Sequence, residues 1–191
     1  RCHGADENIR NSARATGFMT PKSATDKLFR DEVLGLAADY PFARRLVNSG
    51  RLSVPCSLAG FDLQTPAGDD GAGVAPGEVC PDGPVDGPDG PSWLLHQLGG
   101  EFVLLAVDAA VPVIEGVRTV SVATRGYAGT QGLGDRAGWV EARYGSGKLY
   151  LIRPDQHVAA RFDRVDRATI EAALKRAQAM PEDSHAAPSH A

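Results

Sequence analysis

Two short apolar runs flank a Pro-Asp pair in Leu149-Tyr-Leu-Ile-Arg-Pro-Asp-Gln-His-Val-Ala-Ala-Arg-Phe162. Proline presets the backbone of a turn and aspartate favours one, so this stretch predicts a β-hairpin that turns at Pro154 and Asp155. Gln156 follows at a position that favours the left-handed conformation, which costs a non-glycine residue about 1 kcal/mol. From the sequence alone we therefore expect a Gln156→Gly change to stabilise the hairpin.

The segments around this hairpin predict a central sheet with helices. Residues 92–98 fit a short helix, 101–107 form an apolar run of strand length, and 118–124 alternate like a second strand. Residues 136–144 fit another helix. After the hairpin, Asp166 is a predicted N-cap for a last helix with one apolar face, which carries Ile170, Leu174 and Ala177. The order predicts an α/β fold, and its closing hairpin and helix match a thioredoxin-like arrangement.

The first part of the chain predicts helices instead. Ser23 is a predicted N-cap for a segment with apolar residues at helical spacing, namely Phe29, Val33, Leu36 and Tyr40. Pro41 interrupts this helix, and 42–47 adds a turn or two. We expect 1–53 to be a helical segment that makes a poor core by itself.

A stretch of different composition separates these parts. Residues 60–91 contain eight Gly, six Pro and six Asp, and no Lys or Arg occurs between 52 and 117. Such composition favours turns and extended backbone. We expect 54–91 to be an interdomain linker, either lying on a surface or forming a flexible tether. The thioredoxin-like domain would then span 92–179, with a disordered tail at 180–191.

Composition excludes several classes of function. A net charge of -4 and a pI near 5.7 argue against a general nucleic-acid or anionic-membrane surface. No apolar run approaches the roughly 18 to 20 residues that span a bilayer. The chain begins at Arg1 rather than Met, and its first residues are no signal peptide. We expect a soluble, cytoplasmic chain that begins within a longer protein.

The cysteines and histidines form no recognised site. Cys2, Cys56 and Cys80 are far apart and lie in no C-x-x-C motif, so we expect ordinary thiols in a reducing compartment. None of the histidines lies four residues from another on a helix or beside a cysteine pair, and we assign no metal ligand. These histidines are His3, His96, His157, His185 and His190.

Two glycine-rich stretches resemble nucleotide-binding motifs. Gly132-Leu-Gly134-Asp-Arg-Ala137 fits G-x-G-x-x-A, but several loop residues separate it from the preceding predicted strand, whereas a dinucleotide turn joins strand and helix directly. Gly145-Ser-Gly-Lys148 resembles a phosphate loop, yet Leu149 replaces the Ser or Thr that would bind magnesium. We interpret both stretches as ordinary turns.

A series of short motifs, in order along the chain, carries a family resemblance. The downstream motifs are Gly77-Glu-Val-Cys-Pro-Asp-Gly-Pro-Val85, Leu95-His-Gln-Leu98, Phe102-Val-Leu-Leu105, Ala142-Arg-Tyr-Gly145, Leu151-Ile-Arg-Pro-Asp155 and Val158-Ala-Ala-Arg161. The upstream motifs are Ala5-Asp-Glu-Asn-Ile-Arg-Asn-Ser-Ala-Arg14, Phe18-Met-Thr-Pro-Lys-Ser23 and Pro41-Phe-Ala-Arg-Arg-Leu-Val-Asn-Ser-Gly-Arg-Leu-Ser53. Together they resemble the C-terminal region of class A FAD-dependent aromatic hydroxylases, especially 3-(3-hydroxyphenyl)propionate hydroxylase-like members. That family's hairpin usually has Gly where Gln156 stands.

The resemblance implies a parent enzyme that holds FAD, takes electrons from NAD(P)H and inserts one oxygen atom from O2 into a phenolic ring. The family's flavin-binding motifs lie upstream of the matching region. We therefore assign no catalytic, cofactor-binding or metal residue to this chain, and we expect it to bind no cofactor and to be inactive alone.

Two different functions are open for the chain itself. A packing or dimerisation module, in contact with the upstream flavin and substrate domains or with a second copy, is the role that the resemblance implies. A stand-alone thioredoxin-like module with a thiol redox or protein-binding role is the alternative. Thiol chemistry would need a reactive pair directly after the first core strand, where this chain has Asp108-Ala-Ala-Val-Pro112.

Overall fold

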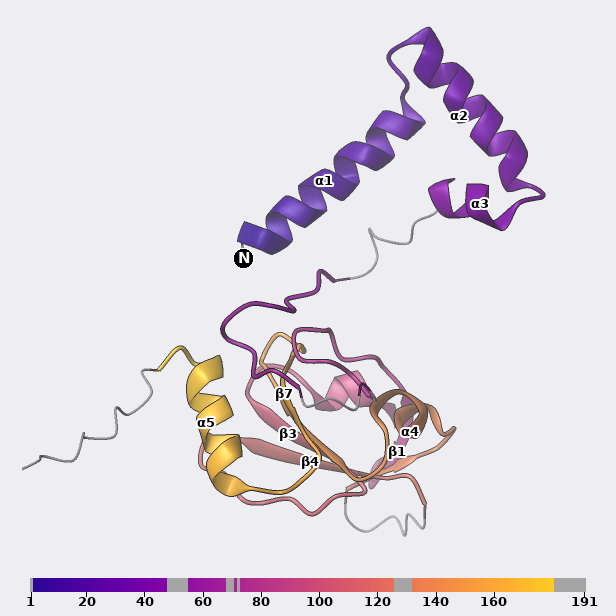
Figure 1. Ribbon diagram of the computed structural model, residues 1–191. Helices are drawn as coiled ribbons and strands as arrows, with labels where there is room; N and C mark the ends of the chain where they lie inside the picture. Colours follow the sequence, from indigo (N-terminus) through magenta and orange to yellow (C-terminus); the bar gives the residue numbers. More distant parts are fainter. Residues whose placement is uncertain (1, 48–54, 68–70, 72, 126–131, 181–191) are drawn as a thin grey trace, which may run out of the picture. The chain divides into compact units, whose positions relative to one another are not determined.

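A computed structural model describes residues 2–47, 55–67, 71, 73–125 and 132–180 of the chain, which divides into two units (Figure 1). The first unit, Arg1–Cys56, is helical, and the second, Ser57–Ala191, contains a β-sheet. The predicted tail falls almost wholly outside the described residues, and so do His185 and His190.

One seven-stranded sheet forms the centre of the second unit, in the order β2-β1-β5-β4-β3-β6-β7. β3 pairs in parallel with β4 and antiparallel with β6, and β6 pairs antiparallel with β7. The predicted α/β class with a sheet flanked by helices is confirmed. The strands are β1 (Pro84–Gly87), β2 (Gly90–Trp93), β3 (Val103–Val107), β4 (Arg118–Ala123), β5 (Leu133–Asp135), β6 (Lys148–Ile152) and β7 (Val158–Phe162).

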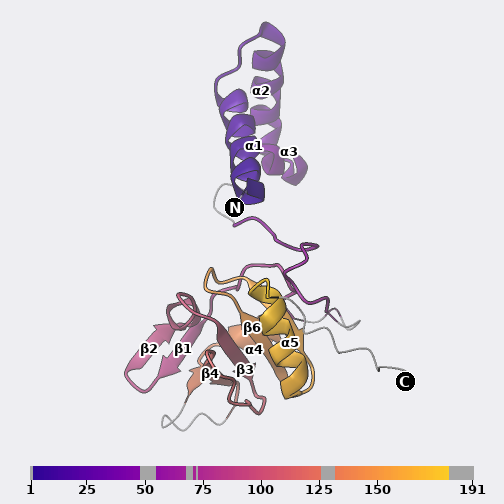
Figure 2. The same cartoon turned by 90° about the vertical axis from the view of Figure 1, so that its left-hand side faces the viewer.

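Buried apolar clusters lie on both faces of this sheet. Figure 2 shows the helix α5 (Arg167–Ala177) lying over the face that is turned toward the viewer. On one face, Leu105 of β3 belongs to the same buried cluster as Val140 and Tyr144 of α4 (Trp139–Tyr144), together with Leu94 of a 3-10 turn at Leu94–Gln97. On the other face, Leu104 lies in a cluster with Ile170 of α5 (Arg167–Ala177). Successive residues of β3 face opposite sides of the sheet, and both sides are covered. β3 is therefore buried along its whole length, which explains its unbroken apolar sequence.

The predicted hairpin forms as the sequence indicates. The Gln156 N–H donates to the Arg153 carbonyl at 2.9 Å, which closes the turn over Pro154 and Asp155. The Arg153 N–H donates to the His157 carbonyl at 2.9 Å, and Gln156 has a φ of 63°, so it occupies the left-handed position. A type I turn followed by a left-handed residue is a common three-residue hairpin loop. The Asp166 cap of α5 is confirmed as well, since its side chain accepts from the N–H groups of Ala168 and Thr169.

The expected effect of Gln156→Gly changes once the side chain is seen. The Gln156 Nε2 donates to the carbonyls of Leu95 and Leu98, each at 3.0 Å. Each bond contributes about 0.5–1.5 kcal/mol, so the two together outweigh the conformational gain of about 1 kcal/mol from glycine. We now expect Gln156→Gly to lower stability by about 1 kcal/mol. Gln156→Ala should lower it further, because alanine loses the bonds and keeps the strain; equal unfolding midpoints in urea for the two variants would contradict the turn assignment.

Part of the predicted linker 54–91 belongs to the sheet, and the linker prediction is wrong there. β1 and β2 pair with each other, and β1 also pairs with β5. Val74, Cys80 and Val85 are buried in the core. A two-stranded edge ribbon needs few apolar residues and tolerates Gly and Pro at its turn and outer edge, so composition alone did not reveal it.

The rest of this stretch covers the outer edge of β7. We call residues 57–67 and 73–80 the edge segment. The Thr65 N–H donates to the Ala159 carbonyl at 2.9 Å, and the Gly77 N–H donates to the Val158 carbonyl at 2.7 Å. The Val158 N–H in turn donates to the Glu78 carbonyl at 2.9 Å. β7 is therefore a buried strand with backbone partners on both sides (Figure 1).

The first unit consists of α1 (Cys2–Met19), α2 (Ala24–Ala37) and α3 (Pro41–Val47). The predicted cap is confirmed, since Ser23 Oγ accepts from the Asp26 N–H at 3.0 Å. Within the described part of this unit, the buried residues are Val33 and Ala43. The helices form as their spacing predicts, but with almost no interior of their own.

Three other expectations need adjustment. The predicted helix at 92–98 is the end of β2 followed by the 3-10 turn, and the helix predicted at 136–144 begins only at Trp139. The short strand β5 was not predicted. The described residues 108–117 contain no helix between β3 and β4, so the thioredoxin-like label stays a prediction.

Candidate functional site

The loop after β3 holds a carboxylate where thiol redox chemistry would need cysteine. Asp108 has a φ of 49°, and its carboxylate accepts hydrogen bonds from the Thr124 N–H at 2.9 Å and from the Ser146 hydroxyl at 2.7 Å. Burial acts to raise the pKa of Asp108. The bond from the Thr124 hydroxyl, the two bonds above and the charge of Arg125 together outweigh burial, so the pKa lies below its ordinary value. Asp108 thus links the end of β3 to the segment after β4 and to the loop between α4 and β6.

Cys80 lies in a buried cluster with two tyrosines. Burial raises the pKa of the Cys80 thiol to about 12, although a hydrogen bond with Tyr144 acts to lower it. The Tyr144 hydroxyl donates to the Pro81 carbonyl at 2.8 Å, and the Tyr150 hydroxyl donates to the Tyr144 carbonyl. The rings of Tyr144 and Tyr150 meet edge to face, with their centroids 5.2 Å apart. This arrangement fills the core and keeps the thiol protonated, and therefore poorly nucleophilic.

We expect iodoacetamide at pH 8 to modify Cys2 in the folded chain while leaving Cys80 unmodified. Cys2 is exposed on α1, whereas Cys80 is buried and its pKa lies far above the pH. Peptide mass spectrometry measures both sites, and the same reaction in guanidinium chloride should modify both equally. Modification of Cys80 in the folded chain at the rate of Cys2 would contradict its burial.

The glycine-rich look-alikes take structural roles. β5 lies inside the stretch 132–137, and its last residue, Asp135, accepts from the N–H groups of Trp139 and Glu141 at the start of α4. The stretch 145–148 leads from α4 into β6, and Lys148 pairs with Asp163 at 2.6 Å. Neither stretch has the glycine arrangement of a dinucleotide turn between strand and helix. The interpretation as an ordinary turn holds for 145–148, but it is wrong for 132–137, which contains the strand β5.

Among the residues that the structure describes, no group of three or more His, Cys, Asp and Glu side chains is placed to hold a metal ion. His157 is buried, and Val79 of the edge segment forms a β-bridge with it. Its Nδ1 lies 3.1 Å from the Asp155 carbonyl.

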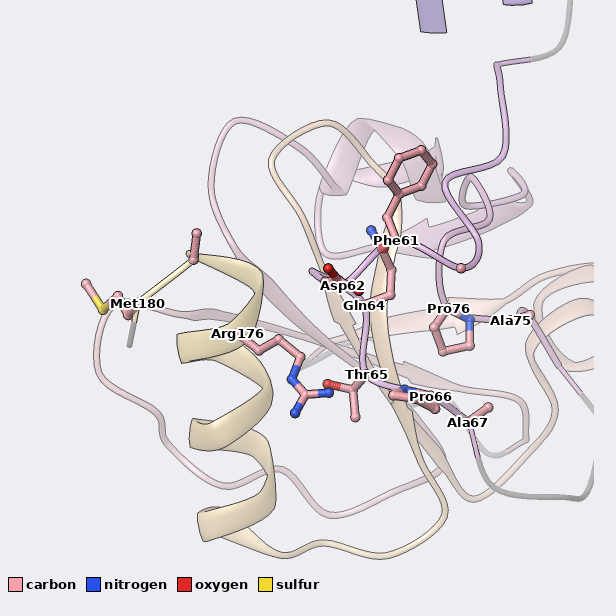
Figure 3. Close-up of a pocket in the computed structure, with 12 residues that line it drawn as sticks. Phe61, Asp62, Gln64, Thr65, Pro66, Ala67, Ala75, Pro76, Arg176 and Met180 are labelled. Carbon is pink, nitrogen blue, oxygen red and sulfur yellow. The ribbon is translucent and has the colours of Figure 1, made fainter. Parts of the chain in front are cut away.

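One pocket of about 880 Å³ lies where the edge segment meets the C-terminal end of α5 (Figure 3). Its walls are mostly apolar, with Phe61, Pro66, Ala75, Pro76 and Met180 among the lining residues. Thr65, Asp62 and Arg176 supply polar groups, and Figure 3 shows the Thr65 and Arg176 side chains pointing toward one another. Sequence reasoning missed this pocket because its walls come from distant parts of the chain.

Comparisons with known proteins place this geometry in a family. The model of the aromatic-ring hydroxylase C-terminal region matches residues 74–181. This range covers the whole sheet with its helices and begins within the predicted linker. The chain therefore belongs to the family of aromatic-ring hydroxylase C-terminal regions. No curated protein matches the chain.

Solved structures support the same fold. The flavin-dependent monooxygenase PieE, in complex with FAD and substrate, matches 92% of this chain with a TM-score of 0.51 at 20% identity. RebC-10x, soaked with chromopyrrolic acid, matches 90% with a TM-score of 0.53 at 16% identity. The chain spans 37% and 33% of the length of these two proteins. At such identities the likeness shows the fold alone.

Proposed function

We propose that this chain forms the C-terminal, non-catalytic region of a FAD-dependent aromatic hydroxylase. The family match over residues 74–181 is the observation that carries this proposal. The parent enzyme would take electrons from NAD(P)H and insert one oxygen atom from O2 into a phenolic ring. The match covers 37% of PieE, which is bound to FAD and substrate, and we propose that the parent binds flavin outside the region that this chain represents.

Within that enzyme, we propose that the first unit packs on the flavin and substrate domains. An independent helical bundle would turn its large apolar side chains inward, yet several here are more than half exposed. These are Ile9, Met19, Leu28, Phe29, Phe42 and Leu46. Contact with apolar surfaces of the parent would bury these side chains. We also propose that two copies of the chain form a homodimer.

The alternative role in thiol redox chemistry has no support in the site. Cys80 is buried and protonated, and Cys2 and Cys56 belong to the other unit.

No described helix is long and apolar enough to cross a membrane. We propose a cytoplasmic protein whose partners are neither nucleic acid nor membrane.

The purified chain with and without added FAD tests the proposal. We expect a colourless protein whose absorption spectrum, after removal of free FAD, shows no flavin band. Sedimentation velocity of the same sample should show a dimer. A stoichiometric flavin band, or NAD(P)H oxidation by the chain with FAD, would overturn the non-catalytic role; a monomer at all concentrations would overturn the homodimer.

A further inference from the structure

Half of the sheet has a buried layer on one side only. On the α4 side, β4, β5 and β1 supply Val122, Leu133 and Val85 to the buried apolar cluster. On the α5 side, the buried cluster takes its strand residues from β3, β6 and β7, and none comes from the described residues of β4, β5, β1 or β2. In Figure 2, β1 and β2 lie beside α5, and no helix is drawn in front of them. These four strands are therefore open on the α5 side.

The strand register shows which side chains lie on this open side. Thr119 and Ser121 of β4 pair with the two β3 residues of the α5-side cluster, so they point to the same side of the sheet. The register continues from Ala123 through β5 to Asp86 of β1 and then to Pro91 of β2. We call this surface the open face, and its side chains are small or polar apart from one large aromatic ring. It includes Asp86, Pro91, Trp93, Thr119, Ser121 and Ala123.

The open face exists because the connection from β3 to β4 contains no helix. A crossover between parallel strands usually contains a helix that packs on the sheet. Here the crossover, residues 108–117, runs on the α5 side, since its Ile114 is buried in that side's cluster, but it contains bends and a turn instead of a helix. β4 pairs in parallel with both β3 and β5, and parallel strands are almost always covered on both faces. This part of the sheet thus lacks the second layer that such strands normally have.

The exposed groups of the open face suit a second copy of the same surface. The Trp93 side chain is 44% exposed, and a large aromatic ring gains much from burial in a protein interface. The Asp86 carboxylate and the Arg136 guanidinium lie 3.7 Å apart, and each side chain remains about 40% exposed, so their pairing within one chain contributes little. A face that carries one charge of each sign is complementary to itself when it is turned about a two-fold axis.

We propose that the open face is the surface through which two copies of this chain form a homodimer. This inference rests on the homodimer proposed above and names its interface. Asp86 of one copy would pair with Arg136 of the other, twice across the two-fold axis, and Trp93 would be buried between the copies. The small side chains of β4 would allow the two sheets to pack face to face at about 10 Å, the usual spacing of stacked sheets.

Complementary charge reversals in the full chain test this pairing by sedimentation velocity. Asp86→Arg and Arg136→Asp each place like charges across the axis, so each alone should weaken dimerisation about tenfold or more. An equimolar mixture of the two variants should restore dimers, because the mixed dimer regains both opposite-charge contacts between its copies. Like charges remain within each single chain, so pairing inside one chain cannot explain the recovery. Glu171→Arg, at an exposed site of α5, is the control and should leave dimerisation unchanged.

Two outcomes of the charge experiment would overturn the open face as the interface. One is a mixture that stays monomeric although circular dichroism shows both variants to be folded. The other is a dimer that neither reversal weakens, which would leave the homodimer in place but move it to another surface. A monomer of the unchanged chain at all concentrations would overturn the homodimer and this interface together, whereas the non-catalytic role is tested separately by the flavin spectrum.

The two tryptophans of the chain provide a second, matched test. Trp139 lies on α4, on the other side of the sheet, and is 48% exposed, close to the value for Trp93. Trp93→Ala should weaken dimerisation about tenfold or more, whereas Trp139→Ala should change it by less than about threefold. In a Trp139→Phe chain, the Trp93 emission should move to shorter wavelength as dimers form with rising concentration. Equal losses in the two alanine variants, or an emission that stays constant while dimers form, would overturn the proposal.

Discussion

Replacement of Ile170 by alanine is expected to destabilise the sheet-containing unit by about 2–5 kcal/mol. Ile170 is fully buried on α5, in the cluster that contains Leu104, Leu149 and Leu151. Alanine would remove three carbons and leave a cavity that the rigid central strands β3 and β6 cannot fill. Ile170 and Ala173 are the buried residues of α5 in this cluster. Loss of the Ile170 side chain would therefore weaken the packing of the whole helix on the sheet.

Guanidinium chloride unfolding followed by circular dichroism measures the Ile170→Ala effect. Arg167→Ala is the matched control on the same helix, since Arg167 is exposed and only pairs with Glu171 at 2.7 Å. Such a surface change should alter stability by no more than about 0.5 kcal/mol. A loss below about 1 kcal/mol for Ile170→Ala would mean that α5 contributes little to the core.

Gly77→Ala is expected to detach part of the edge segment from β7, with a loss of more than about 2 kcal/mol. Gly77 has a φ of +91°, which costs alanine about 1 kcal/mol in itself. A Cβ at this position would also meet the Ala59 backbone nitrogen at 2.3 Å and its Cα at 2.5 Å. Backbone atoms cannot rotate away as a side chain can, so the bond from the Leu58 N–H to the Gly77 carbonyl should break.

Gly90→Ala separates the two causes of this loss. Gly90 has a φ of +107°, but a Cβ there would have no atom within 4 Å, so this variant reports the conformational cost alone. Hydrogen exchange measures the local effect, and the amides of Leu58, Thr65 and Gly77 should exchange much faster in Gly77→Ala than in Gly90→Ala. Equal exchange in both variants would show that the edge segment adjusts without leaving β7.

The sequence predicts the elements whose causes are local. The hairpin depends on Pro154, Asp155 and the apolar runs beside them, and the caps at Ser23 and Asp166 depend on a few neighbouring residues. β3 is recognised by its unbroken apolar sequence, and β4 by its alternation of polar and apolar residues. In each case a short stretch contains all the information that decides its structure.

The features that the sequence could not predict depend on distant partners. β1 contains Pro, Asp and Gly, and β5 contains Gly and Asp, and they become strands only because each borders another strand. Gln156 is unfavourable for its turn when judged locally, yet its amide binds the carbonyls of Leu95 and Leu98. The pocket arises where Thr65 and Arg176 meet, and no short motif contains both.

The edge segment has a consequence for aggregation. A buried apolar strand such as β7, if its outer edge were open, could pair with the same strand of another molecule and begin a continuous intermolecular sheet. Hydrogen bonds with Thr65, Gly77 and Glu78 occupy that edge at Val158 and Ala159. At the opposite edge of the sheet, β2 is short and carries Pro91, which lacks an N–H donor. In the described part of the sheet, neither edge strand therefore presents a long open row of backbone donors and acceptors to a strand of another molecule.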